Sequence, residues 1–196
     1  MNWKVLLFIG VIGFGAFHHF QQRAVIHGPG VIAPNTPSQN TARQADIQMN
    51  GFSLTPLELY EIEARVLSRE DYTFGTEAEL SPTDLAVGWG PMSDEAILKK
   101  INISQGNRFY YWRVDSFPIP QRQIEIHSAN MHIIPANDSV KRQLSKVRQG
   151  QLVKIKGLLV EAKRADGWNW RSSLSREDTG NGACELMYVT DLYIRQ

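Results

Sequence analysis

A five-residue pattern that carries two acids occurs twice in the chain. Leu-Ser-Arg-Glu-Asp stands at residues 67–71 and again at residues 174–178, each time after a predicted strand and before a Gly-containing loop. Two equivalent turns, side by side on a sheet, would gather oxygen ligands for Ca²⁺ or Mg²⁺, or a carboxylate pair for acid–base chemistry. The acids concerned are Glu70, Asp71, Glu177 and Asp178. We favour a structural interpretation, in which each arginine pairs with nearby acids and contributes about 1 kcal/mol or less.

Two histidines five positions apart, His127 and His132, form a second candidate metal site. On a continuous strand this spacing places the rings on opposite faces, so a shared ion requires the chain to bend at residues 128–130. We therefore favour hydrogen-bonded structural histidines. Ser128 and Cys184 are candidate nucleophiles, but the sequence contains no Gly-x-Ser-x-Gly motif, P-loop, dinucleotide fingerprint, His-Glu-x-x-His motif or EF-hand spacing. The sequence assigns no catalytic residue and predicts no cofactor, with a divalent cation as the alternative.

Aromatic residues next to arginines form a third candidate site, for binding. Phe-Tyr-Tyr-Trp stands at residues 109–112 and Trp-Asn-Trp-Arg at residues 168–171. Flat rings beside cations can stack on nucleic-acid bases or sugars. The candidate binding residues are Trp112, Trp168, Trp170 and Arg171. We favour packing in the core, because alternate members of an aromatic strand usually face inward.

The composition is that of one ordinary globular domain, with 196 residues of which 42% are hydrophobic and 21% charged. The single cysteine excludes an intramolecular disulfide and a four-cysteine zinc site. The net charge of +1 gives no overall attraction for a polyanion, so we do not expect nucleic acid as a partner. The formal charges of residues 53–98, 99–176 and 177–196 are −8, +10 and −3, which predicts a bipolar surface.

Residues 1–20 are predicted to act at a membrane. An uncharged apolar run covers residues 5–17, and interfacial flanks extend the segment to residues 3–20, close to the roughly 20 residues of a full span. We favour an uncleaved signal-anchor over a cleaved signal peptide, because no Ala-x-Ala motif occurs. Lys4 then predicts a single-pass inner-membrane protein whose C-terminal domain lies outside the cytoplasm, in the periplasm. Cleavage would instead give a secreted protein.

The remaining chain divides into a linker and one domain. Residues 21–52 contain three prolines and many polar residues, so we expect a flexible linker with a mean reach of about 30 Å. Residues 53–196 are predicted to form a single globular domain.

Hydrophobic periodicity and turn residues predict the elements of this domain. A half-buried strand follows Pro56, a helical turn begins at Ser81-Pro82, and Ser93-Asp94-Glu95 caps a short helix that ends at Ile101. Further strands are predicted at residues 109–114, 123–134, 152–163, 168–174 and 185–194, with a helix from Asp138 to Gly150.

Strands outnumber helices in this pattern, and hairpins join neighbouring strands. We therefore predict an α+β fold that is mainly β, with a few short helices and a small antiparallel sheet. A helix followed by a strand bent at Gly157, a hairpin at Asp166-Gly167 and a closing strand suits a five-stranded OB-like barrel.

Several stretches resemble an uncharacterised family of short bacterial proteins with an N-terminal hydrophobic segment. These stretches are Ser-Arg-Glu-Asp-Tyr with Ser-Pro-Thr-Asp-Leu-Ala-Val-Gly-Trp-Gly (68–90), Arg-Phe-Tyr-Tyr-Trp-Arg (108–113), His-Ser-Ala-Asn-Met-His (127–132) and Ser-Arg-Glu-Asp-Thr-Gly-Asn-Gly-Ala-Cys-Glu-Leu (175–186). The resemblance implies a bacterial, membrane-associated setting and brings with it no activity and no site residue.

The sequence thus favours a membrane-anchored envelope protein whose domain binds or assembles with a protein partner and does not catalyse a reaction. Two alternatives stay open. One is a cation-dependent hydrolase or cation-binding domain that uses the duplicated acidic turns. The other is a glycan or nucleic-acid binder that uses exposed aromatic residues.

Overall fold

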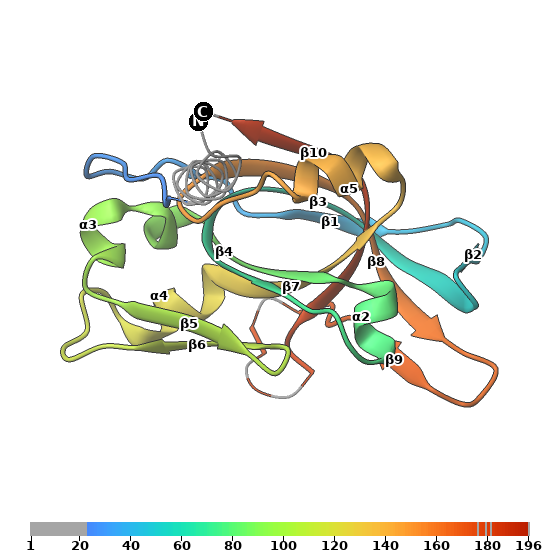
Figure 1. The fold of residues 1–196 in the computed structure, drawn as a ribbon. Helices are drawn as coiled ribbons and strands as arrows, with labels where there is room; N and C mark the ends of the chain where they lie inside the picture. Colours follow the sequence, from blue (N-terminus) through green and yellow to red (C-terminus); the bar gives the residue numbers. More distant parts are fainter. Residues whose placement is uncertain (1–22, 176, 179, 181, 196) are drawn as a thin grey trace, which may run out of the picture.

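The computed structural model describes residues 23–175, 177, 178, 180 and 182–195. The predicted membrane segment, residues 1–20, lies outside the described residues. Among those described, no helix is long and apolar enough to cross a bilayer. The elements, shown in Figure 1, are β1 (Ser38–Thr41), β2 (Ile47–Met49), β3 (Phe52–Asp71), α2 (Thr76–Leu80), β4 (Thr83–Gly88), the 3-10 helix η1 (Gly90–Ser93), α3 (Glu95–Leu98), β5 (Asn102–Gly106), β6 (Phe109–Arg113), α4 (Gln121–Ile126), β7 (Ser128–Pro135), α5 (Asp138–Leu144), β8 (Leu152–Lys163), β9 (Asn169–Arg171) and β10 (Glu185–Arg195).

Five strands pair in the order β3-β4-β7-β10-β8, and β8 pairs again with β3. Every pair in this ring is antiparallel except β7 with β10, which run parallel. Within the described chain, α5 is the helix that connects β7 to β8, which are the third and fourth strands of the ring in chain order. The fold is mainly β and rich in antiparallel pairs, as predicted, and its strand order suits the OB-like barrel.

The ring closes around one apolar core. From Tyr60 onward β3 alternates, so that Tyr60, Ile62 and Ala64 are buried while the residues between them face outward. Inward-facing residues of the other four strands complete this core. Helix α5 packs Val140 and Leu144 into the same core, and its first turn is capped by the Asn137 side chain rather than by the predicted Asp138.

The predicted bend at Gly157 coincides with a close approach of two strands. A Cβ atom at this position would lie 2.0 Å from the carbonyl oxygen of Tyr188, so only glycine lets β8 and β10 meet here. The register of the same pair shifts between Val189 and Asp191, directly beside Gly157. A β-bulge of this kind bends the strand and re-aims its side chains.

The flexible linker predicted for residues 21–52 is corrected from Arg23 onward, because this arm takes part in the fold. The amide of Val25 donates to the carbonyl of Gln149 at 2.8 Å, β1 and β2 pair with β3, and Ala33 is fully buried in the core. A polar composition indicates that a segment cannot form its own core. It does not reveal that other strands supply hydrogen-bond partners for its backbone.

Two further local predictions are wrong. Residues 83–88 form β4, where Ser81-Pro82 predicted a helical turn, and residues 121–126 form α4, part of which was predicted as extended chain. All six residues of β4 are buried, so the strand lacks the alternation of a half-buried sheet. In both segments, contacts with distant parts of the chain determine the secondary structure.

Candidate functional site

The outer side of β4 and β7 carries a buried ionic cluster. Asp84 of β4 and His132 of β7 are register partners with exposed fractions of 0% and 2%. The Nη1 atom of Arg108 donates to Oδ1 of Asp84 and to the carbonyl of Ser81, each at 2.9 Å. His132 Nδ1 lies 2.9 Å from Asp84 Oδ1, but neither this nitrogen nor Asp84 Oδ2 has a hydrogen-bond partner within the described chain. Arg108 therefore compensates the buried carboxylate.

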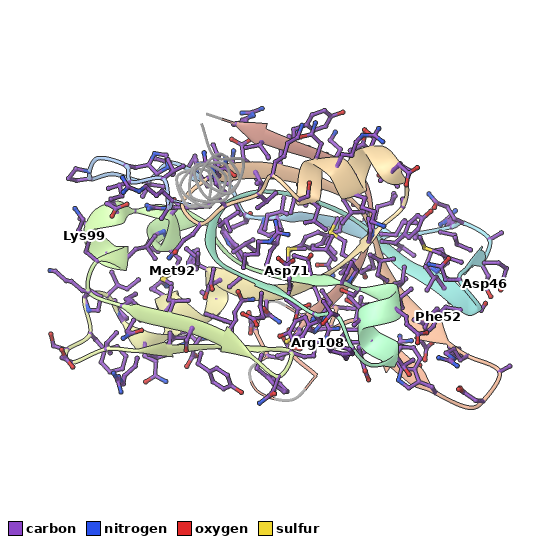
Figure 2. All side chains as sticks on the ribbon, in the orientation of Figure 1. Asp46, Phe52, Asp71, Met92, Lys99 and Arg108 are labelled. Carbon is purple, nitrogen blue, oxygen red and sulfur yellow. The ribbon has the colours of Figure 1, made fainter. Side chains whose placement is uncertain are left out.

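Arg108 occupies an unusual position in the turn between β5 and β6, near α2 in Figure 2. Asn107 and Arg108 have φ angles of 52° and 69°, and the second centre of such a turn normally holds glycine. The Arg108 guanidinium lies 3.7 Å from the centroid of the Tyr72 ring and 5.6 Å from that of Trp170. Asn130 donates to the Arg108 carbonyl at 2.9 Å. These contacts stabilise the left-handed backbone conformation of Arg108, which a non-glycine residue rarely adopts in an exposed turn.

The β5–β6 hairpin covers the outer side of β4 and β7. Gln105 donates to the Asn130 side chain at 2.8 Å, and the Tyr110 hydroxyl is hydrogen-bonded to Ser128. From the other direction Trp170 places its ring 4.5 Å from that of His132. In OB folds the second and third strands of the barrel, here β4 and β7, carry the usual ligand surface. We call this surface the closed face, because the chain's own segments cover it.

Two candidate nucleophiles contact the closed face: Ser128 begins β7, and the Cys184 sulfur lies 3.8 Å from the side-chain nitrogen of Asn130. Burial raises the pKa of Cys184 to about 12, so the neutral thiol is the stable form near neutral pH. Burial likewise raises the pKa of Tyr110 to about 12. The Ser128 hydroxyl donates to the carbonyl of Ile124 at 2.6 Å. The contacts of these groups are thus those of structural side chains.

The two Ser-Arg-Glu-Asp copies lie in different settings. The first copy ends β3, where Asp71 accepts hydrogen bonds from Arg69 at 2.8 Å and from Thr83 at 2.6 Å. Burial by itself would raise the pKa of Asp71, but these hydrogen bonds have the larger effect and lower it. Glu70 is the register partner of Asp84. The second copy follows β9, where Ser173 donates to Asp178 at 2.5 Å. The described contacts of the two copies therefore share no partner.

The candidate metal ligands do not gather. Glu177 lies 3.4 Å from Arg122, which follows Pro120 at the start of α4. His127 ends that helix, with Nδ1 at 3.0 Å from the Gln123 carbonyl, whereas His132 belongs to the buried cluster. Across the described residues, no three His, Cys, Asp or Glu side chains lie close enough to hold a metal ion.

The candidate stacking residues are used mainly in packing. Trp168 packs at 5.4 Å from the Phe52 ring and 6.1 Å from the Trp170 ring. Trp112 is partly buried and lies 6.1 Å from Phe117. Arg171 is exposed on β9 and donates to Glu161 at 3.0 Å.

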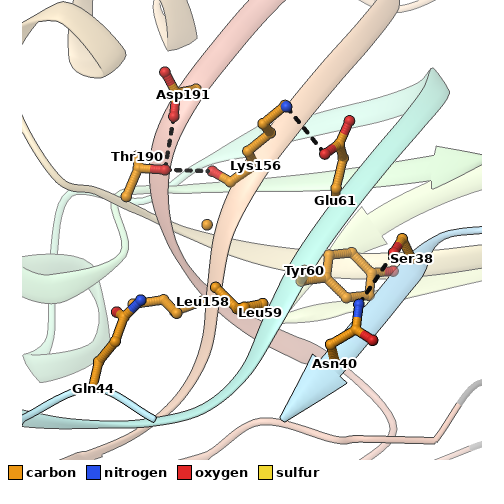
Figure 3. A pocket seen from close by; sticks show the side chains of 11 residues that line it. Ser38, Asn40, Gln44, Leu59, Tyr60, Glu61, Lys156, Leu158, Thr190 and Asp191 are labelled. Carbon is orange, nitrogen blue, oxygen red and sulfur yellow. Dashed lines mark hydrogen bonds and ion pairs between the residues drawn. The ribbon is translucent and has the colours of Figure 1, made fainter. Parts of the chain in front are cut away.

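A groove opens on another part of the barrel, over β1, β3, β8 and β10 (Figure 3). Its volume is about 400 Å³, within the range of ligand-binding hollows. It is lined by Ser38, Asn40, Gln44, Leu59, Tyr60, Glu61, Lys156, Gly157, Leu158, Thr190 and Asp191. We call this surface the open face. Sequence reasoning missed it, although the bend predicted at Gly157 lies in its lining.

Apolar and charged groups share the open face. Leu59 and Leu158 are register partners, and the Leu59 side chain is 44% exposed. Beside them Glu61 accepts from Lys154 at 2.7 Å and Lys156 at 3.1 Å, and these hydrogen bonds lower the pKa of the Glu61 carboxyl. Leu158 itself is 4% exposed and belongs to the core, so the groove offers the Leu59 side chain beside charged residues.

Comparison of the chain with protein-family models, with curated proteins and with solved structures found no match.

Proposed function

We propose that the protein is a membrane-anchored envelope protein whose domain binds a partner protein through the open face without catalysing a reaction. The observation that carries this proposal is the groove over β1, β3, β8 and β10, which lies open while the usual OB surface is filled. The membrane segment, the inner-membrane location and the periplasmic side of the domain are parts of the same proposal. They are supported by the apolar run over residues 5–17.

An extended peptide segment of the partner suits this groove best. Among the described strands β1 pairs with β3 alone, so its second edge is available for another strand. Side chains of Ser38 and Asn40 on β1 line the groove next to that edge. Adding a strand to a sheet edge satisfies the peptide backbone, and neighbouring hollows then select alternate side chains.

The lining also indicates which side chains the peptide would carry. The exposed Leu59 side chain, next to the buried Leu158, suits an apolar side chain of the peptide. Lys156 and Asp191 at its border suit flanking residues of either charge, while Gln44 offers an amide. We therefore expect recognition of an apolar residue in a polar, extended segment.

Site-specific photocrosslinking in membranes of the native bacterium tests the proposal. Benzoyl-phenylalanine at Gln44, inside the groove, should crosslink one discrete protein. The same crosslinker at Phe74, which is 92% exposed in the connection between β3 and α2, is the matched control and should not yield that product. Adding Leu59→Glu to the Gln44 variant should remove the product, because a charge replaces the apolar floor.

Identical products from positions 44 and 74 would contradict the proposal, and so would a product that survives Leu59→Glu. The Leu59→Glu variant must retain the unfolding temperature of the parent within a few degrees. Leu59 is exposed enough for that comparison, because surface substitutions usually change stability by about 0.5 kcal/mol or less.

A further inference from the structure

The arm joins the domain immediately after the hydrophobic segment. Val25 donates from its amide to the Gln149 carbonyl at 2.8 Å, and the His27 ring lies 2.7 Å from the Gly150 carbonyl. Gly150 has a φ of 86°, and a Cβ atom there would lie 1.8 Å from the Val25 carbonyl oxygen. Glycine at this position thus permits both the left-handed backbone conformation after α5 and the close approach of Val25.

The chain between the hydrophobic segment and Val25, where the arm contacts the domain, is short. The segment ends at Phe20, and the five residues 21–25 span at most roughly 18 Å when fully extended. The headgroup layer alone takes up roughly 5–8 Å on each side of the bilayer core. Because the arm is docked on the domain from Val25 onward, it cannot extend over the 30 Å expected of a flexible linker. With residues 1–20 in the membrane, the surface around Val25 and Gln149 would therefore stay close to the bilayer.

This surface carries basic side chains. Lys99, which caps α3, lines a hollow of about 170 Å³ together with Val25 and Gln149. Lys100, directly after Lys99 in the chain, is exposed, and Lys146 is exposed in the segment between α5 and Gln149. Figure 2 labels Lys99 at the end of the molecule where the arm begins.

The acids on the same side are already engaged. Glu95 is buried in an ion pair with Arg65, and it also accepts from the His27 amide at 3.3 Å. Asp94 accepts from the amides of Gly30 at 2.9 Å and Ala96 at 2.8 Å. The amides of Gly30 and Ala96 lower the pKa of Asp94 and leave it ionised, so this surface keeps one carboxylate charge, which the charges of Lys99 and Lys100 exceed.

Apolar side chains accompany the lysines. Ile26 is 75% exposed and Val31 49% exposed, and both lie on the arm. The hollow beside Ile26 is lined further by Leu98, Ile101 and Ile103. Exposed apolar residues among lysines are the pattern of surfaces that lie in the membrane interface.

We infer that this surface, formed by the arm, the end of α3 and the loop from α5 to β8, lies on the bilayer and binds anionic phospholipid headgroups. The inference rests on the proposed membrane anchor. Its ligand class follows from charge complementarity between the lysines and phosphate groups, with Ile26 and Val31 inserted between headgroups. The open face with its groove can then meet a partner while the basic surface faces the lipid.

A fluorescent label on the full chain tests this arrangement. Ile26→Cys in a Cys184→Ala background would carry a polarity-sensitive dye, and Ala165→Cys in the exposed β8–β9 turn is the matched control. In vesicles of phosphatidylcholine with phosphatidylglycerol, the label at position 26 should shift to the blue and be quenched by headgroup-labelled lipid. The label at position 165 should do neither. Lys99→Glu, Lys100→Glu and Lys146→Glu together should weaken the preference for phosphatidylglycerol by roughly fivefold per charge.

The outcomes separate this inference from the proposed anchor. A chain that floats with vesicles while the label at position 26 stays in water overturns the lipid contact and leaves the anchor standing. A chain that does not float overturns both. Equal quenching in vesicles with and without phosphatidylglycerol, unaffected by the three lysine reversals, overturns the anionic specificity.

Discussion

The closed face, on β4 and β7, and the open face, on β1, β3, β8 and β10, belong to one barrel but treat their charges in opposite ways. On the closed face, Asp84 is fully buried and is compensated within the chain by Arg108, whose side chain is 17% exposed. On the open face, Glu61 forms ion pairs with Lys154 and Lys156 that remain in contact with solvent. The comparison teaches that the usual ligand surface of a fold can be filled by the protein's own insertions, so that function has to be read from each surface.

The first prediction concerns the removal of the buried carboxylate. Asp84→Ala should lower the free energy of unfolding by about 3 kcal/mol, because the largely buried Arg108 is left without its acid. Asp191→Ala, an acid of the open face, is the matched control and should cost about 1 kcal/mol or less. Urea denaturation measures both. Similar costs at the two positions would remove the distinction between the faces.

Thiol reactivity gives the second prediction. Burial raises the pKa of Cys184 from 9.0 to about 12, so at pH 8 its thiolate population should be smaller by a factor on the order of 10³. Alkylation of Cys184 in the folded protein should be slower than that of an ordinary thiol by a similar factor. Its rate should still increase as the pH rises above 9. Gln44→Cys with Cys184→Ala places a thiol in the open groove and should react at an ordinary rate. Equal rates for the two thiols would show that the closed face is accessible.

The third prediction addresses the bend beneath the groove. Gly157→Ala should destabilise the protein by about 1–3 kcal/mol, because the new methyl group meets the Tyr188 carbonyl. The Gln44 crosslink should weaken as well, since the bulge beside Gly157 shapes the groove. Gly106→Ala in β5, where a Cβ atom meets nothing within 4 Å, is the control. A neutral Gly157→Ala would mean that the strands move apart without consequence.

The smallest effect is expected for an ion pair of the open face. Glu61→Gln should lower the free energy of unfolding by less than about 1 kcal/mol near pH 7, and added salt should reduce the difference. The two lysines lower the pKa of Glu61 from 4.5, so the carboxylate contributes above that value, and its contribution disappears as the pH falls through the lowered pKa. Thermal unfolding across this pH range measures the effect. A larger loss that persists in high salt would place Glu61 among the buried groups.

Some elements follow from local sequence because their signals are local. Strand β8 has the predicted bounds of residues 152–163, and β10 extends one residue beyond its predicted end. Both strands alternate over part of their length, and Asp166-Gly167 lies in the turn from β8 to β9. The barrel follows from the order of such elements, which is why the fold class is confirmed.

Other features depend on partners distant in the chain. Asp84 is a lone acid within a strand of buried residues, which signals a buried cation nearby. Nothing local identifies that cation as Arg108, whose left-handed turn is held by Tyr72 and Asn130. The groove is still less accessible to sequence reasoning, since four strands contribute to it and only their register brings the residues together.

The length of β3 has a consequence for how the molecule comes apart. This one strand, Phe52–Asp71, pairs with β1, β2, β4 and β8, so the arm, the barrel and the open face share a single backbone ladder. Because β3 is the common partner of these four strands, its unfolding would release all of them at once. We therefore expect the strands of the arm and of the barrel to lose their pairing together when β3 unfolds, whereas a pull on the N-terminal end of the chain would first load the contact between Val25 and Gln149.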